Sequence, residues 1–151
     1  MKNIFRLLLF MLLFILSIGN SHAQSELFTV EGEVLFSETG DIYITLVTEQ
    51  LFGTPYEGVR KSLITVGEEE LKAGCVRFRF IGVDAGVYGI RCYQDVNGNS
   101  ELDRGLFGPS EPWGMSWQQE KPSRWPKFEN IAFKVKADIR DIKILLQNPP
   151  R

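Results

Sequence analysis

The residues of this chain best suited to chemistry are oxygen-bearing side chains at alternate positions of one short loop. Asp95, Asn97, Asn99 and Asp103 occupy positions 1, 3, 5 and 9 of that loop, and Glu101 at position 7 would offer its backbone carbonyl. Calcium takes about six to eight oxygen ligands from carboxylates, amides, backbone carbonyls and water. The spacing therefore predicts a calcium site formed by these five residues.

The same loop also fits a turn that binds no metal. A calcium loop of the EF-hand type has Gly at its sixth position and an acidic residue at its twelfth, where this chain has Ser100 and Leu106. Asp and Asn side chains also accept hydrogen bonds from nearby backbone N–H groups and tolerate left-handed backbone. A plain turn is therefore the alternative to calcium.

Three tryptophans follow the loop, at Trp113, Trp117 and Trp125. Sugar rings have apolar C–H faces that stack on aromatic rings, so exposed and coplanar indoles would form a platform for a glycan. The other interpretation is that the indoles fold inward and cover an open end of the domain, because large aromatic side chains in ordered loops usually supply burial.

The distribution of catalytic residue types argues against an enzyme. The only histidine, His22, lies in a segment that we expect to be removed, which leaves no imidazole for acid–base catalysis, nucleophile activation or metal binding. Carboxylate pairs such as Asp95 with Asp103, or Glu101 with Glu111, could hydrolyse glycosides only across a cleft. A small domain offers little cleft, so we expect a non-enzymatic protein.

The N-terminal segment has the features of a secretory signal peptide. Two basic residues precede an uncharged apolar run at 7–18, and a small-x-small cleavage site follows at 21–23. The run is too short for a comfortable membrane span. We therefore expect residues 1–23 to be removed and residues 24–151 to form one exported domain, periplasmic or secreted, without a membrane span.

The net charge of the expected exported chain limits the partners that it could bind. Cleavage leaves 15 of the 17 basic residues against 19 acidic ones, a net charge of −4, which excludes nucleic acid as an expected partner. Glycans and cell-envelope proteins are the partners that we consider instead.

Cys75 and Cys92 would meet an oxidising compartment. Strand parity places them on opposite faces, so a disulfide would need a bulge, and both states stay open.

Alternation of apolar and polar residues predicts the elements that must position these loops. The segments with this period are 27–36, 41–48, 59–66, 75–81, 87–93, 128–136 and 139–147. The turn at 37–40 predicts a hairpin of the first two strands. Residues 50–58 are expected as a loop, and the charged segment 67–74 as a turn, with one helical turn as the alternative. About seven short strands predict a single-domain, all-β antiparallel β-sandwich.

The inner faces of these strands predict the core. They supply Phe28, Val30, Ile42, Ile44, Phe78, Phe80, Ile90, Phe133 and Ile144. The sequence thus predicts an exported, non-enzymatic β-sandwich module of unknown role that calcium stabilises through the 95–103 loop. A glycan-binding module that uses the Trp-rich 113–125 loop is the alternative.

Several short motifs resemble those of a known family. They are Gly86-Val87-Tyr88, residues 95–99, Leu102-Asp103, Gly108-Pro109, Glu111-Pro112, Trp113-Gly114 and residues 128–133. They resemble exported bacterial proteins of the domain of unknown function 2141 family. The resemblance implies a prealbumin-like or immunoglobulin-like β-sandwich behind a signal peptide, and it implies no activity. The chain departs from the family pattern at Ser100, where a second glycine is usual, and in the Trp-rich insert at 117–125.

Overall fold

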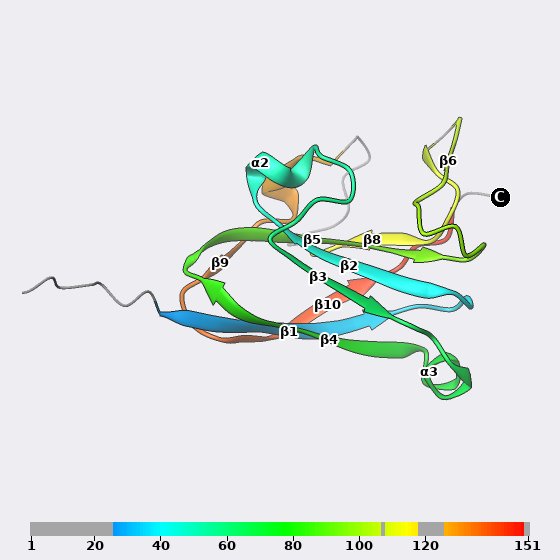
Figure 1. Ribbon diagram of the computed structural model, residues 1–151, viewed down its shortest axis with the longest axis horizontal. Helices are drawn as coiled ribbons and strands as arrows, with labels where there is room; N and C mark the ends of the chain where they lie inside the picture. Colours follow the sequence, from blue (N-terminus) through cyan, green and yellow to red (C-terminus); the bar gives the residue numbers. More distant parts are fainter. Residues whose placement is uncertain (1–25, 107, 118–125, 150–151) are drawn as a thin grey trace, which may run out of the picture.

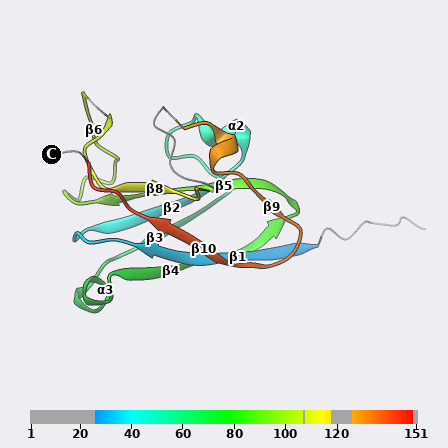
Figure 2. The ribbon, with the colours of Figure 1, turned by 180° about the vertical axis from the view of Figure 1, so that it is seen from behind.

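Two β-sheets pack face to face and enclose one main core, as Figures 1 and 2 show from opposite sides. The structure, a computed structural model, describes residues 26–106, 108–117 and 126–149. The predicted all-β sandwich is confirmed. The predicted signal peptide at 1–23 lies outside the described residues. Within the described residues no helix is long and apolar enough to cross a membrane.

The smaller sheet has three strands. Its central strand β1 (Leu27–Leu35) pairs in parallel with β10 (Ile139–Leu145) and antiparallel with β4 (Cys75–Asp84). The larger sheet has the order β3-β2-β5-β8, and β9 pairs with the first residues of β5. Its strands are β2 (Asp41–Val47), β3 (Arg60–Ile64), β5 (Gly86–Asp95), β8 (Trp113–Met115) and β9 (Phe133–Val135). A small ribbon of β6 (Arg104–Gly105) and β7 (Gly108–Pro109) stands apart.

The period-two pattern explains which side chains fill the space between the sheets. β4 buries Val76, Phe78 and Phe80 and turns the two intervening arginines to solvent. Every residue predicted for the core lies in it, with Phe28 and Phe133 partly buried at its margin. Burial of side chains of this size stabilises the fold by about 1.5–3 kcal/mol each.

The predicted hairpin of the first two strands is wrong. β1 and β2 lie in different sheets, and the turn at 37–40 carries the chain across the sandwich. Both edges of β1 are occupied by β4 and β10, while β2 pairs with β3 and β5. The apolar face of an alternating strand is buried both when two strands pair within one sheet and when they lie in facing sheets. The alternation therefore does not distinguish a hairpin from a crossover.

Two short helices replace segments expected without regular structure. In 67–74 the helical alternative is correct: α3 (Glu68–Ala73) starts where the Gly67 N–H donates to the Glu70 carboxylate at 3.0 Å, and it ends at Gly74 with φ +66°. The loop expected at 50–58 begins instead with α2 (Glu49–Phe52). The strand predicted at 128–136 begins instead with the 3₁₀ turn η1 (Phe128–Asn130), and only its later part forms β9.

The α2 helix and η1 lie on the outer face of the larger sheet (Figures 1 and 2). They close a second hydrophobic cluster there, around the buried side chains of Val47, Phe128 and Ile131. Partly buried residues at its edge are Leu51, Phe52, Met115, Trp117 and Ala132. The outer face of the larger sheet is therefore covered in part by the chain itself.

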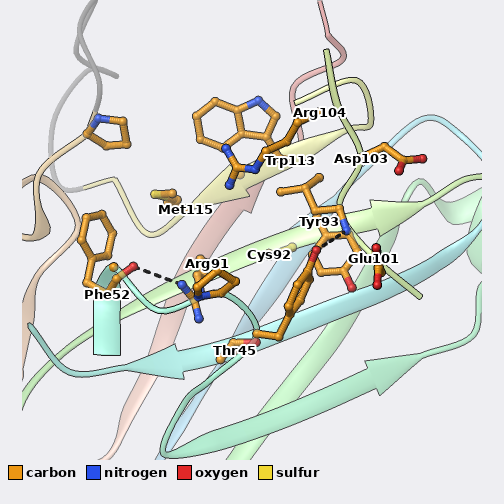
Figure 3. A pocket seen from close by; sticks show the side chains of 16 residues that line it. Thr45, Phe52, Arg91, Cys92, Tyr93, Glu101, Asp103, Arg104, Trp113 and Met115 are labelled. Carbon is orange, nitrogen blue, oxygen red and sulfur yellow. Dashed lines mark hydrogen bonds between the residues drawn. The ribbon is translucent and has the colours of Figure 1, made fainter. Parts of the chain in front are cut away.

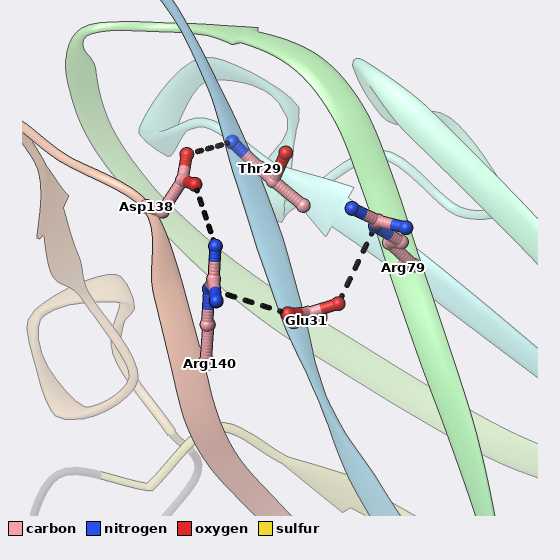
Figure 4. A network of polar contacts seen from close by, with 5 residues as sticks. All are labelled: Thr29, Glu31, Arg79, Asp138 and Arg140. Carbon is pink, nitrogen blue, oxygen red and sulfur yellow. Dashed lines mark hydrogen bonds and ion pairs between the residues drawn. The ribbon is translucent and has the colours of Figure 1, made fainter.

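The outer face of the smaller sheet instead carries a charged network (Figure 4). The Glu31 carboxylate lies 3.4 Å from Arg79 and 3.5 Å from Arg140, and Arg140 also contacts Asp138 at 3.2 Å. The Thr29 N–H donates to Asp138 at 2.9 Å, and this bond, followed by that from Arg140, lowers the pKa of Asp138. Exposed ion pairs contribute little to stability, so this face is an ordinary solvated surface.

The two cysteines are free in the structure. Cys75 lies on β4 and Cys92 on β5, in opposite sheets, and Cys92 is buried in the core while Cys75 is half-exposed. The alternation of apolar and polar residues therefore predicted correctly that Cys92 lies on the buried face of its strand. Burial raises the pKa of the Cys92 thiol far above its ordinary value, which keeps it unreactive at neutral pH.

Candidate functional site

A pocket of about 640 Å³ opens on the outer face of the larger sheet (Figure 3). Its floor comes from β2, β5 and β8, one wall from the end of α2 and the loop after it, and the other from residues 101–104. The side chains on which its chemistry depends are Phe52, Tyr56, Arg91, Tyr93, Glu101, Asp103, Arg104, Trp113 and Met115. Its size is in the range of about 300–1,000 Å³ that is usual for small-molecule sites.

Strand register sets the floor of the pocket. On β5 the side chains of Ile90 and Cys92 enter the core, so Arg91 and Tyr93 point outward. The antiparallel pairing with β8 places Met115 opposite Arg91 and Trp113 opposite Tyr93. Four outward side chains of different chemistry therefore meet on two neighbouring strands.

Glycine allows β8 to approach the core closely. A Cβ atom on Gly114 would lie 2.7 Å from the Leu145 carbonyl oxygen and 2.9 Å from Cγ2 of Ile144. No side chain fits at this position, so the strand can sit against β10 while its neighbours turn outward. The structure thus explains the sequence Trp113-Gly114: Gly114 faces β10, where no side chain fits, and Trp113 lines the pocket.

Arg91 fastens the α2 wall to the floor. Its Nη1 donates to the Phe52 carbonyl at 3.1 Å, and its Nη2 donates to the carbonyls of Thr54 and Glu57, both at 2.6 Å. Burial lowers the pKa of Arg91, and repulsion from Arg104 lowers it further, whereas Glu57 acts in the opposite direction. Arg91 still carries its charge at neutral pH, because an arginine pKa starts above 12.

Tyrosine rings support the opposite end of the floor. Tyr93 stacks on Tyr43 with ring centroids 4.9 Å apart and planes within 3°, and Tyr56 meets Tyr93 edge-on at 6.4 Å. Burial, followed by the neighbouring tyrosines and two carboxylates, raises the pKa of Tyr93. The Tyr93 hydroxyl therefore stays protonated and donates to the Ser100 carbonyl at 3.1 Å, which ties the 95–103 loop to the sheet.

The first predicted calcium ligand, Asp95, is buried and bonded to its own loop. Only 3% of its surface is exposed. Its Oδ1 accepts the N–H groups of Gly98 at 2.7 Å and Asn99 at 3.1 Å, and its Oδ2 accepts that of Ser100 at 2.7 Å. Ser100 has φ +65° and Gly98 φ +75°. The left-handed backbone at Ser100 explains why glycine suits this position.

Three of the other four predicted ligands, Asn97, Asn99 and Asp103, lie together. Nδ2 of Asn97 donates to Oδ2 of Asp103 at 2.6 Å, and Nδ2 of Asn99 lies 3.2 Å from both oxygens of Asp103. The amide oxygens point the other way, where Oδ1 of Asn97 accepts the Asn99 N–H at 3.1 Å and Oδ1 of Asn99 accepts the Glu101 N–H at 2.9 Å. The structure therefore gathers Asn97, Asn99 and Asp103, and it gives Asp95 a separate role.

Glu111, which the sequence suggested only as a catalytic partner of Glu101, is a second buried carboxylate that accepts backbone N–H groups of the loop. Its Oε1 accepts the Val96 N–H at 2.8 Å, and its Oε2 accepts the Asp103 N–H at 3.1 Å. The Tyr56 hydroxyl accepts the Leu102 N–H at 3.1 Å. Every backbone N–H from Val96 to Asp103 except that of Asn97 thus donates to a side-chain oxygen.

The loop network also separates the carboxylate pairs considered for catalysis. Asp103 and Glu101 line the pocket, whereas their partners Asp95 and Glu111 are buried and accept backbone N–H groups. Each pair therefore has one member in the pocket wall and one inside the loop. Among the described residues, no three His, Cys, Asp or Glu side chains form a group that could hold a metal.

The predicted tryptophans divide in the same way. Trp113 lines the pocket, while Trp117 packs against the second hydrophobic cluster, and their rings meet at 71° with centroids 6.1 Å apart. The expected coplanar platform is therefore wrong for these two indoles, because their planes are far from parallel and one ring meets the other edge-on. Trp125 lies outside the described residues.

Arg91 and Tyr56 are pocket residues that the sequence analysis missed. A charged residue between Ile90 and Cys92, inside an apolar run, was the available signal for Arg91. Tyr56 carried none, because its loop contacts the 95–103 loop from about forty-six positions away.

Comparison with known proteins identifies a family but no characterised relative. No curated protein and no solved structure matches the chain. One family model matches residues 30–143, a range that includes most of both sheets and all residues that line the pocket. The chain therefore belongs to the family described as uncharacterized protein conserved in bacteria, DUF2141.

Proposed function

We propose that this protein is an exported, non-catalytic module that binds a carbohydrate in the pocket on its larger sheet. The observation that carries the proposal is the lining of that pocket. Trp113, Tyr93, Tyr56 and Phe52 offer aromatic surface, and charged groups lie among them. A sugar ring has apolar C–H faces for the aromatic surface and hydroxyl groups for the charged groups. Aromatic residues with a few polar groups are typical of small-ligand sites.

The burial of Asp95 and Glu111 supports a binding role over a hydrolytic one. Glycosidases place two carboxyl groups on either side of the scissile bond, about 5–9.5 Å apart. In this chain the backbone N–H groups of the loop occupy both buried carboxylates. Glu101 and Asp103 remain as acceptors for sugar hydroxyls in the pocket wall.

An array of immobilised glycans, read with the purified protein, tests this function. We expect a restricted group of glycans to bind, and we expect Trp113→Ala to remove that binding. Leu145→Ala, which truncates an exposed side chain on the other sheet, is the matched control and should bind as the wild type does. A wild-type protein that binds no glycan on the array would contradict the proposal.

Calcium stabilisation of the 95–103 loop is a second proposal, favoured by the gathering of Asn97, Asn99 and Asp103. If their amides turned over, two further oxygens would join the Asp103 carboxylate, at the cost of two hydrogen bonds to backbone N–H groups. A calcium concentration 100 times Kd would stabilise the domain by about 2.7 kcal/mol.

Thermal melting with and without millimolar calcium tests the second proposal. We expect calcium to raise the melting temperature of the wild type but not that of the double variant Asp95→Asn/Asp103→Asn. Magnesium should have a smaller effect, because it demands a tighter octahedron and loses water reluctantly. An unchanged wild-type melting temperature would leave the loop as a metal-free turn.

A further inference from the structure

We infer that the carbohydrate carries a carboxylate, as a uronic acid does, and that Arg91 and Arg104 bind it; this rests on the carbohydrate-binding function proposed above. The two guanidinium groups line the same pocket. In Figure 3 Arg91 lies low in the pocket and Arg104 lies high, while Glu101 and Asp103 lie toward the right.

Arg91 forms no ion pair with the described residues, and the Glu57 carboxylate offsets only part of the effect of burial on its pKa. The groups it contacts are the backbone carbonyls of Phe52, Thr54 and Glu57, which are neutral acceptors. Among the described residues no carboxylate lies within ion-pair distance of this half-buried guanidinium. A cation removed from water without an anion is costly. A ligand carboxylate would supply the ion-pair partner in direct contact that Arg91 lacks among the described residues.

Arg91 also retains donors for such a ligand. A guanidinium has five N–H groups, and the three carbonyls engage one on Nη1 and two on Nη2. The Nε–H and the second Nη1–H have no partner among the described residues. Guanidinium groups bind carboxylates through charge-assisted hydrogen bonds, which are about twice as strong as neutral ones.

A second cation strengthens the preference for an anion. Arg104 is close enough to repel Arg91, which is the second cause of the lowered Arg91 pKa after burial. An anion that bound both groups would remove this repulsion. The half-buried position of Arg91 also reduces screening by salt.

Glu101 and Asp103, the two carboxylates in the pocket wall, limit which anionic ligands the pocket could bind. Glu101 and Asp103 would repel a purely anionic ligand such as phosphate, but they accept hydrogen bonds from hydroxyl groups. A ligand with a carboxylate for the arginines, hydroxyls for the acidic residues and an apolar ring face for Trp113 satisfies all three surfaces. A uronic acid has this combination.

Calorimetric titration with matched sugars tests the inference. The probes are oligosaccharides of galacturonic, glucuronic and mannuronic acid, each paired with the neutral oligosaccharide of the same linkage. We expect at least one acidic probe to bind about tenfold or more tightly than its neutral counterpart. Arg104→Gln should remove most of this difference. Arg77→Gln, which removes the same charge from the exposed face of β4, is the control and should leave it unchanged.

The possible outcomes distinguish the inference of an acidic ligand from the proposed carbohydrate-binding function. Neutral probes that bind as tightly as acidic ones would overturn the acidic ligand and leave the carbohydrate function intact. Acidic binding that survives both Arg104→Gln and Arg91→Gln would also overturn the inference, because the carboxylate would then bind elsewhere. No binding by any probe, together with an empty glycan array, would overturn both. Melting curves show whether each variant is folded.

Discussion

Replacement of Asp95 by asparagine should destabilise the domain, because one buried carboxylate organises the loop beside the pocket. The side chain accepts three backbone N–H groups, two on Oδ1 and one on Oδ2. Asparagine has nearly the same shape but only one oxygen. In either orientation of the amide, its NH₂ group faces at least one backbone N–H, and the negative charge is lost.

The size of this effect follows from the hydrogen bonds. A bond to a charged group contributes about 1.5–3 kcal/mol, and the loss of one such bond together with weakening of the others should cost about 2–3 kcal/mol. For a domain of this size that corresponds to a fall in melting temperature of about 10 °C. Thermal unfolding followed by circular dichroism, in buffer without divalent cations, measures it.

Asp141→Asn is the matched control. Asp141 is exposed on β10 and has no hydrogen bond or ion pair among the described residues. Its replacement should change the free energy of unfolding by less than about 0.5 kcal/mol. Equal melting temperatures for the two variants would refute the role of Asp95 as an internal hub.

Two further predictions concern thiol reactivity and acid stability. In the native protein a thiol reagent at pH 8 should label Cys75 but not Cys92, whose pKa burial raises; mass spectrometry of the labelled peptides checks this, and rapid labelling of Cys92 would contradict its place in the core. The folded-state pKa of Asp138 is lowered from 3.8, so the ionised carboxylate stabilises the fold above about pH 4, and this contribution is lost as the pH falls through the folded-state value. Urea unfolding should therefore separate wild type from Asp138→Asn at pH 7 and not near pH 2; a separation that persists there would contradict the Thr29 and Arg140 contacts as its source.

The sequence predicted the strands better than their partners. Alternation in β4 and β5 was sufficient to assign Phe78, Phe80 and Ile90 to the core, because a half-buried strand repeats every two residues. The same pattern did not distinguish a hairpin from a crossover between sheets at 37–40. Pairing of β1 with β10 depends on residues more than a hundred positions apart, for which local patterns carry no information.

The candidate site could be predicted in part. The recurrence of Asp and Asn identified the 95–103 loop, but it did not distinguish a ligand that faces a cation from one that accepts backbone N–H groups. In this structure the Asp95 carboxylate accepts backbone N–H groups. Tyr56 reaches the loop only through tertiary structure, and Arg91 needed the outward register of β5 to be recognised as a pocket residue.

The most direct test of the central claim is a two-dimensional NMR titration of the protein with a galacturonic-acid oligosaccharide. If the sugar binds in the pocket, we expect shifts of the Trp113 indole N–H and of the backbone amides of Arg91, Tyr93 and Met115, which lie on the pocket floor. The amide of Glu31, on the charged outer face of the smaller sheet, should not move. Shifts confined to that opposite face, or no shifts at saturating sugar, would contradict binding in the pocket.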